Sequence, residues 1–288
     1  MNCNLCNDTG YIDNVFIVGD LSQAEARVVA ECLKRIGYPK LHNLYKDKNF
    51  DIHRWAAAPI FNCSESEVTK YQREVGKLSN HSGNYGAGPR VLVDKALKDG
   101  LKGIDYRFAK HILEIRHEQL PGLKKWWKDV EKQLNQTRTL TTCFGRRRIF
   151  FGRLDESTFR DAYSYEPQST VGDVCNTLFR LLWNKFRREE WSDILSSFWS
   201  PSRKSDSLKG GQSLDVYRRL RPTPLIQVHD EVVVRCPNIP ELVDYAIDEF
   251  RKAANIELYI CKDEPLIIPL DLKIGPNWKD TKDVVLHS

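Results

Sequence analysis

The sequence lacks long apolar runs and a recognisable export signal. Its apolar stretches, such as residues 16–18 and 232–234, are far too short to cross a bilayer. The N-terminus has none of the cationic, apolar and small-residue regions of a secretory signal. We therefore expect no membrane partner and a location in the cytoplasm.

The sequence has only a small excess of positive charge, and it has almost no closely spaced cysteine pairs. The 288 residues carry 44 Lys plus Arg against 39 Asp plus Glu, a net charge of +5, which permits a nucleic-acid partner without requiring one. The eight cysteines are mostly isolated, as in a protein with reduced thiols. Cys3 and Cys6 have C-x-x-C spacing, but no second Cys/His pair follows at zinc-finger spacing. A frayed terminus explains this pair better than a zinc site.

Strand patterns lie near both ends of the chain. The apolar, β-branched run 15–19 predicts a strand that ends at Asp20, and an S-x-x-E capping box predicts a helix after it. Near the C-terminus, LIQVHDEVVVRC predicts two short strands around a turn, and PLIIPLDLKIG predicts another strand. Residues 65–138 and about 170–190 have mostly helical patterns. The sequence therefore predicts an α+β platform that carries a helical subdomain.

Two aspartates lie at predicted strand ends, Asp20 after the first strand and Asp230 in the later turn. Carboxylates on adjacent strand tips can converge on hard divalent cations, which prefer oxygen ligands. Two such ions, about 3.5–4 Å apart, can activate an attacking hydroxyl and stabilise a leaving phosphate oxygen. Each aspartate alone has an ordinary explanation, as a residue at the start of a helix or as a turn residue.

Arg73, Lys77, His81 and Tyr85 recur every four residues. On a helix they would form one slowly winding stripe about 18 Å long. Two cations at one end would suit a triphosphate, and the rings further along would suit stacking on a base or a sugar. A solvated cationic face is the alternative for the two cations.

Three segments resemble the characteristic motifs of family-A DNA polymerases: GDLSQAEAR at 19–27 is similar to motif A, R-x-x-x-K-x-x-x-H-x-x-x-Y-G at 73–86 to motif B, and QVHDE at 227–231 to motif C. Three accessory segments follow the family's order, T-x-x-G-R-R-R at 142–148, R-x-x-x-S-x-x-x-Q at 160–168 and I-G-P-N-W at 274–278. The resemblance covers nearly the whole chain.

The resemblance implies a polymerase of the bacterial or phage type. Its palm, with an antiparallel sheet, would comprise residues 1–30 and 160–288. Its helical fingers would comprise 31–159, with a nucleotide-binding helix at about 67–85. The cytoplasm would be that of a bacterium or of a phage-infected cell.

The resemblance also implies a two-metal site. Asp20 and Asp230 would bind two Mg²⁺ ions, for which Mn²⁺ could substitute, with the carbonyl of Leu21 as a third ligand. Glu231 would lie beside the metals and tune them. Lys77 would donate a proton to the leaving pyrophosphate.

Further roles concern the nucleotide and the DNA. Glu25 would crowd the sugar 2′ position, Arg73 and Lys77 would bind the triphosphate of the incoming dNTP, and Tyr85 would pack beside the nascent base pair. The remaining residues implied to contact nucleotide or primer–template DNA are Gln23, His81, Arg160, Ser164, Gln168 and His229. These contacts would use minor-groove acceptors and phosphates, so the binding would be independent of sequence and sensitive to salt.

The sequence departs from the family at three positions without losing a metal ligand. His81 replaces an aromatic ring that tests the sugar 3′ position, which puts discrimination against dideoxynucleotides in doubt. Ser164 occupies a position usually held by Asn, and Ser169 one usually held by Gly.

Upstream family features are missing. Only 19 residues precede Asp20, and the T-G-R-L motif is absent. We expect that thumb and exonuclease domains are absent, and that the chain is the C-terminal piece of a split or truncated polymerase. A partner chain would then supply the thumb or the exonuclease domain.

The leading hypothesis is a template-directed DNA polymerase. One alternative is a single-subunit RNA polymerase, against which Glu25 and the H-D-E form of motif C argue. The other is a non-catalytic nucleic-acid-binding or assembly protein.

Overall fold

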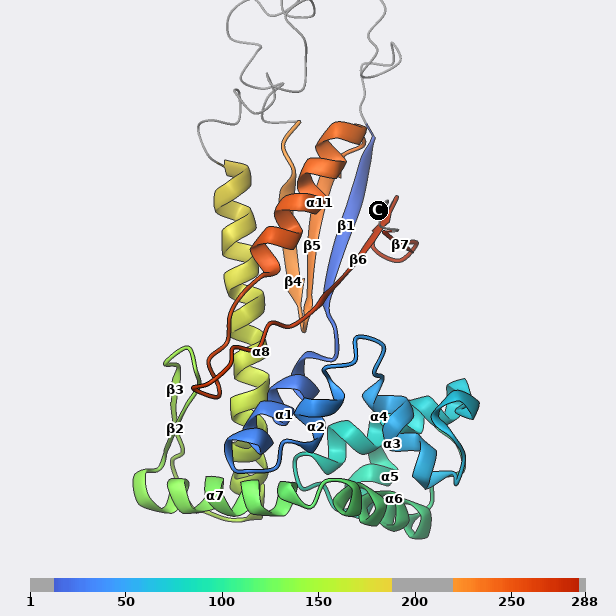
Figure 1. Ribbon diagram of the computed structural model, residues 1–288, viewed down its shortest axis with the longest axis vertical. Helices are drawn as coiled ribbons and strands as arrows, with labels where there is room; N and C mark the ends of the chain where they lie inside the picture. The colour runs from blue at the N-terminus through green and yellow to red at the C-terminus, as the bar shows by residue number, and fades with distance from the viewer. Residues whose placement is uncertain (1–12, 188–219, 285–288) are drawn as a thin grey trace, which may run out of the picture. The chain divides into compact units, whose positions relative to one another are not determined.

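The computed structural model describes residues 13–187 and 220–284, which form two compact units (Figure 1). The sheet unit contains the described parts of 1–22, 172–256 and 267–288, and the helical unit contains 23–171 and 257–266. Cys3 and Cys6 lie outside the described residues. Within the described ranges, no helix combines the length and the apolar character needed to cross a membrane.

The sheet unit is built on a five-stranded antiparallel sheet in the order β4-β5-β1-β6-β7. Its strands are β1 (Asn14–Leu21), β4 (Thr223–Val228), β5 (Glu231–Pro237), β6 (Leu270–Gly275) and β7 (Lys282–Asp283). The expected first strand, the hairpin around 229–230 and the C-terminal strand are thereby confirmed. Because β1 lies in the middle of the sheet, it pairs with a partner on each side.

Helices α11 (Pro240–Ala254) and the C-terminal part of α8 (Glu156–Arg187) contribute to the core of this unit (Figure 1). Val232 and Val234 of β5 enter this core, as the two-residue period of a strand requires. Gly19 of β1 allows close packing, because a Cβ there would lie 2.4 Å from the Phe250 ring of α11. The core therefore holds the strand that carries Asp20 by direct contact with a helix.

The helical unit consists of short helices and one small hairpin. Its elements are α1 (Ala24–Arg35), α2 (Lys40–Leu44), α3 (Ile52–Ile60), the 3-10 helix η1 (Glu65–Glu67), α4 (Lys70–Gly83), α5 (Pro89–Lys98), α6 (Tyr106–Gln119), α7 (Gly122–Thr137), the paired strands β2 (Thr139–Thr141) and β3 (Arg147–Ile149), and the first part of α8. Side chains define several of the helix starts. Asp51 accepts hydrogen bonds from the first amides of α3, and Thr69 and Gln72 form a capping box at α4.

Three expectations about elements are corrected. Helix α1 begins at Ala24, and its N-cap is Gln23 without a side-chain cap bond, so Ser22 and Glu25 do not cap it as a box. Helix α8 begins at Glu156 rather than near 170, and it includes the whole 160–168 motif. Helix α11 and the β2–β3 hairpin were not expected. The division into palm and fingers stays a prediction. The chain passes from one compact unit to the other between residues 22 and 23 and between residues 171 and 172.

Gly76 permits the close approach of α4 to α3, and this contact gives our first prediction. A Cβ at position 76 would lie 2.0 Å from the carbonyl oxygen of His53, so Gly76→Ala must push the two helices apart. We expect a loss of about 1–3 kcal/mol in the free energy of unfolding. Urea denaturation measures this loss.

Gly172→Ala in α8 is the matched control, because a Cβ at position 172 meets nothing within 4 Å. This variant should leave the free energy of unfolding unchanged or raise it by up to ~1 kcal/mol. Equal effects would contradict the assigned packing.

Candidate active site

Three carboxylates lie in one row across the sheet. In the register of β1 with its two neighbours, Asp20 stands opposite Glu231 of β5 and opposite Asp271 of β6. Residues directly opposite each other in an antiparallel pair project from the same face. Asp230 joins this group from the hairpin turn, where its backbone carbonyl accepts a hydrogen bond from the amide of Leu21 at 3.0 Å. The pairing of three strands thus gathers residues from both ends of the chain.

The turn that carries Asp230 is a two-residue hairpin loop. Val228 pairs with Glu231, so only His229 and Asp230 connect β4 to β5. His229 has a φ of 54°, a left-handed conformation that costs a residue with a side chain about 1–2 kcal/mol. Such conformations occur preferentially at functional sites, where the surrounding structure maintains them. The strained turn brings the aspartate to the end of β1.

Negative charge accumulates at this position. Partial burial, followed by the charges of Asp230 and Glu231, raises the pKa of Asp20 from 3.8 to about 6, although Lys273 opposes the shift. On α8, burial raises the pKa of the Cys175 thiol to about 12, and Asp230 and Asp20 add to this effect. A divalent cation would relieve this repulsion, so the electrostatics of the group suit a metal.

The two carboxylates Asp20 and Asp230 suit an open Mg²⁺ site better than a site in which protein side chains supply all the ligands. Within 13–187 and 220–284, no three His, Cys, Asp or Glu side chains are disposed to hold one metal ion together. Mg²⁺ commonly uses one or two carboxylates and completes its shell with water and substrate phosphates. Asp20 and Asp230 match this open arrangement.

Trp278 is a residue of this group that sequence reasoning did not assign. Its indole Nε1 donates a hydrogen bond to the Glu231 carboxylate at 3.2 Å. Its turn is held by Asn277, whose Oδ1 accepts the backbone amides of Lys279 and Asp280 at 2.9 Å. The only available signal was its membership of the I-G-P-N-W segment, which says nothing about its partner.

In the helical unit, α4 carries three of the four residues of the predicted stripe. Arg73, Lys77 and His81 lie on the helix, whereas Tyr85 follows its end at Gly83 and is not part of the helical stripe. The Arg73 Nε donates to the Asp51 carboxylate at 2.7 Å, and Lys77 is exposed. Asp51 therefore orients Arg73 while it also caps α3.

Two histidines beside these cations are neutral at physiological pH. Burial, with repulsion from Lys95 and Lys77, lowers the pKa of His81 to about 4. Burial, with repulsion from Arg73, lowers the pKa of His53 to about 3. Their ring centroids lie 6.2 Å apart. Sequence reasoning missed His53, whose position two residues after the capping Asp51 was the only signal.

Gln23 is used within the fold. Its side chain donates to the carbonyl of Phe50 at 3.3 Å and accepts from the amide of Ile52 at 3.1 Å and from the Tyr45 hydroxyl at 3.3 Å. Its own φ is 52°. These bonds hold the start of α1 against the segment that leads into α3.

Glu25 and Tyr85 meet across 60 positions of sequence. The Tyr85 hydroxyl donates to the Glu25 carboxylate at 2.8 Å, and burial followed by the Glu25 charge raises the pKa of Tyr85 well above its usual value. The hydrogen bond thus links the first turn of α1 to the residue that follows the C-cap of α4.

The predicted DNA contacts on α8 lie in its helical-unit part. Arg160, Ser164 and Gln168 are spaced by four, which places them on one helix face. The guanidinium of Arg160 lies 3.6 Å from Glu156, and Ser164 Oγ donates to the carbonyl of Asp161 at 3.1 Å. Gln168 is exposed.

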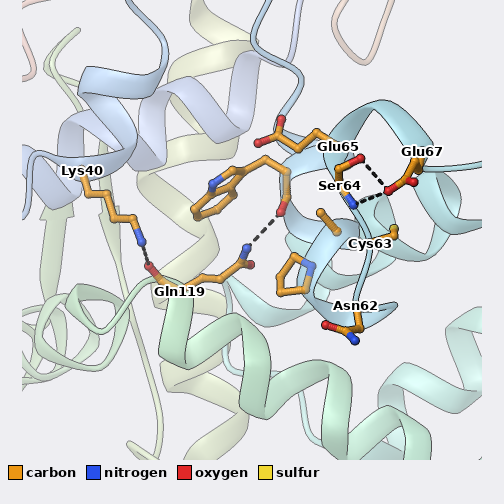
Figure 2. Close-up of a pocket in the computed structure, with 10 residues that line it drawn as sticks. Lys40, Asn62, Cys63, Ser64, Glu65, Glu67 and Gln119 are labelled. Atoms are coloured by element: carbon orange, nitrogen blue, oxygen red, sulfur yellow. Dashed lines mark hydrogen bonds between the residues drawn. The ribbon is translucent and has the colours of Figure 1, made fainter.

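A pocket of about 560 Å³ in the helical unit lies apart from these residues (Figure 2). Lys40 Nζ bonds the carbonyl of Gln119 at 3.1 Å on one side, and the turn at 64–67 lines the other. None of the predicted site residues lines this pocket, so it is not the candidate active site.

Comparison with known proteins decides the family. The family described as DNA polymerase family A matches residues 9–280. The chain belongs to DNA polymerase family A. Family-A DNA polymerases I similar to the chain include that of Aquifex aeolicus, 29% identical over 163 residues, which is 56% of this chain and 27% of that protein. That of Chloroflexus aurantiacus is 23% identical over 280 residues, 94% of this chain and 25% of that protein.

A solved structure of the family supports the fold. The polymerase domain of Pol1 from M. smegmatis, in a complex with DNA primer-template and dNTP, matches with a TM-score of 0.62 at 21% identity, over 92% of this chain and 40% of that chain. The mixed α+β fold is therefore that of a family-A polymerase domain. The chain spans about a quarter of the length of the curated relatives that it matches.

The raised pKa of Asp20 gives our second prediction. Because its folded pKa of about 6 exceeds its ordinary 3.8, ionisation of Asp20 destabilises the metal-free fold increasingly as pH rises from about 4 to about 6, and by a constant amount above. Asp20→Asn should therefore raise the melting temperature near pH 7.5 and lose this advantage near pH 4. Thermal unfolding in EDTA checks it, with the exposed Asp244→Asn on α11 as control. A gain that is the same at both pH values would contradict the assigned repulsion.

Proposed function

We propose that this family-A chain is a DNA-directed DNA polymerase that adds dNTPs to a primer 3′ end. The observation that carries the proposal is the meeting of Asp20 and Asp230 at one end of β1, with Glu231 in the same group. In the reaction, the primer hydroxyl attacks the α-phosphate of the dNTP, and pyrophosphate leaves. Positioning and electrostatics supply most of the catalysis in such transfers.

Asp20, Asp230 and the carbonyl of Leu21 would hold two Mg²⁺ ions, with Mn²⁺ as a substitute. When bound, these ions supply positive charge to the attacking and leaving oxygens. The neighbouring Glu231 adds to the negative field and is oriented by the indole of Trp278. The negative charge that Asp230 and Glu231 place beside Asp20 supports this assignment.

On α4, Arg73 and Lys77 would bind the triphosphate. Asp51 fixes the guanidinium of Arg73 through Nε, which reduces the conformational freedom that binding must remove. Lys77 is exposed and would donate a proton to the leaving pyrophosphate. The neutral ring of His81 would face the sugar without adding a charge.

The Tyr85–Glu25 pair would select the sugar and support the base pair. The hydrogen bond of 2.8 Å orients the Glu25 carboxylate, so that it can crowd a ribose 2′-hydroxyl. Tyr85 would pack beside the nascent base pair. Gln23, already bonded to the segment 45–52, would contribute mainly by holding the start of α1.

Primer–template DNA would contact Arg160, Ser164 and Gln168 on their common face of α8, and His229 in the strained turn. Such contacts to phosphates and shared base acceptors carry little sequence information. A partner chain that supplies a thumb or an exonuclease domain, and a cytoplasmic location, stay predictions.

Our third prediction tests the metal ligands. Asp20→Asn and Asp230→Asn should each lower Mg²⁺-dependent primer extension by about 10²–10³-fold, because each removes a carboxylate that would hold the Mg²⁺ ions, which stabilise the negative charge of the transition state. Single-nucleotide extension of a labelled primer on a template measures it, with Asp244→Asn as the matched control. Equal extension by the wild type and both variants would remove the assignment. A wild type that binds DNA and never extends it would instead favour the non-catalytic binding protein.

Our fourth prediction separates DNA synthesis from RNA synthesis. The wild type should use dNTPs in strong preference to rNTPs, and Glu25→Ala should reduce this preference by about 10-fold or more, since the crowding carboxylate is removed. Side-by-side kcat/KM values for dNTP and rNTP with the same primer–template check it. Preferential use of rNTPs by the wild type would favour the RNA polymerase alternative.

A further inference from the structure

Arg116 of α6 is an arginine in the interior of the helical unit. It is 0% exposed, and burial lowers its pKa to about 9. Its Nη2 donates to the side-chain oxygen of Asn84 at 2.7 Å, whereas Nε and Nη1 have no hydrogen-bond partner among the described residues. A buried charge that no carboxylate compensates is expensive, and an apolar side chain of similar volume is generally tolerated better. Arg116 Cζ also lies 5.9 Å from the centroid of the Trp55 ring, a contact that offsets only part of this cost. Stability alone therefore does not account for a guanidinium at this position.

The partner of Arg116 is held on several sides. Asn84 is 3% exposed, its amide donates to the carbonyl of Asn80 at 3.1 Å, and its carbonyl accepts the indole Nε1 of Trp127 at 2.9 Å. Gly83 leaves room for the arginine, since a Cβ there would lie 2.9 Å from Arg116 Cγ. Side chains of α6 and α7 thus fix both the side chain and the backbone of the residue that ends α4.

Tyr85 and Gly86, the next two residues, lie close to side chains of α1 and α8. Tyr85 follows Asn84 and donates its hydroxyl to Glu25 at 2.8 Å. The Trp127 ring stacks on Tyr163, with centroids 5.4 Å apart, and the Tyr163 ring lies 3.4 Å from the place of a Cβ on Gly86. Hence Asn84 is held by contacts from α6 and α7 and Tyr85 by one from α1, and the Tyr163 ring of α8 lies close to Gly86.

We infer that Arg116 is a positioning residue for the incoming nucleotide, which acts by fixing Asn84 and thereby the placement of Tyr85 and its hydrogen bond to Glu25. The inference rests on the proposed polymerase function and extends it to a residue in the core. A charge-assisted hydrogen bond is directional, whereas apolar packing is not, so it can set the position of the chain after α4. Breaking it frees Tyr85 to leave Glu25, and each nucleotide-binding event must then restore that order.

A double-mutant cycle tests the inference. Arg116→Met, Asn84→Ala and the double variant are compared for dNTP kcat and KM in single-nucleotide extension, together with the melting temperature. Each single variant should raise the KM for dNTP by about 10-fold, the scale of a lost hydrogen bond to a charged group, with a smaller change in kcat. The double variant should resemble the singles, because both changes break one link. Arg116→Lys, which keeps a charged donor, should restore part of the affinity.

The controls separate positioning from stability. Arg107→Met changes an exposed arginine of the same helix and should alter neither KM nor the melting temperature. Additive effects in the cycle, or a lowered melting temperature with unchanged KM in the singles, would overturn the inference. Hydrogen exchange of the peptide around 82–88 gives an activity-independent readout, and it should rise in both singles. If the wild type extends no primer, the proposed function fails; unchanged exchange in folded Asn84→Ala protein refutes the positioning role separately.

Discussion

The antiparallel pairing of β1 with β5 and β6 is the constraint on which the candidate metal site depends. It aligns Asp20 with Glu231 and Asp271 and brings the turn residue Asp230 to the end of the same strand. Phe250 of α11 packs closely on Gly19 of the same strand. Partial burial, followed by repulsion from Asp230 and Glu231, raises the pKa of Asp20. A fold that forces like charges together in this way is prepared for a cation, at the expense of stability without one.

The helical unit uses a different means to order its side chains. Asp51 serves the start of α3 and the guanidinium of Arg73 at once, and Tyr85 is tied to Glu25. The guanidinium of the interior Arg116 has Asn84 as its single hydrogen-bond partner within the described ranges. In each case one polar side chain restricts another, which lowers the entropy that ligand binding must remove.

Local patterns predicted those features whose causes are local. The β-branched run before Asp20, the short hairpin around His229 and Asp230 and the strand before Gly275 are specified by residues within a few positions of one another, and all three are confirmed. The capping box was wrong because the helix begins at Ala24 with Gln23 as its N-cap, and Gln23 makes no side-chain cap bond. Likewise, Tyr85 was predicted to continue the helical stripe because it lies four residues after His81. The helix ends at Gly83, where the side chain of Arg116 packs closely against it.

The sequence by itself determined the family, because its motifs occur in the order typical of that family. It also determined the types and the spacing of the acidic and cationic residues. Only the tertiary structure decided which of them meet. Strand register placed Asp271 and Glu231 in the row of Asp20, and packing placed His53 beside His81 and Arg116 beneath Asn84. The reason is physical: a pattern records local preferences, whereas register and burial are set by contacts between segments that are far apart along the chain.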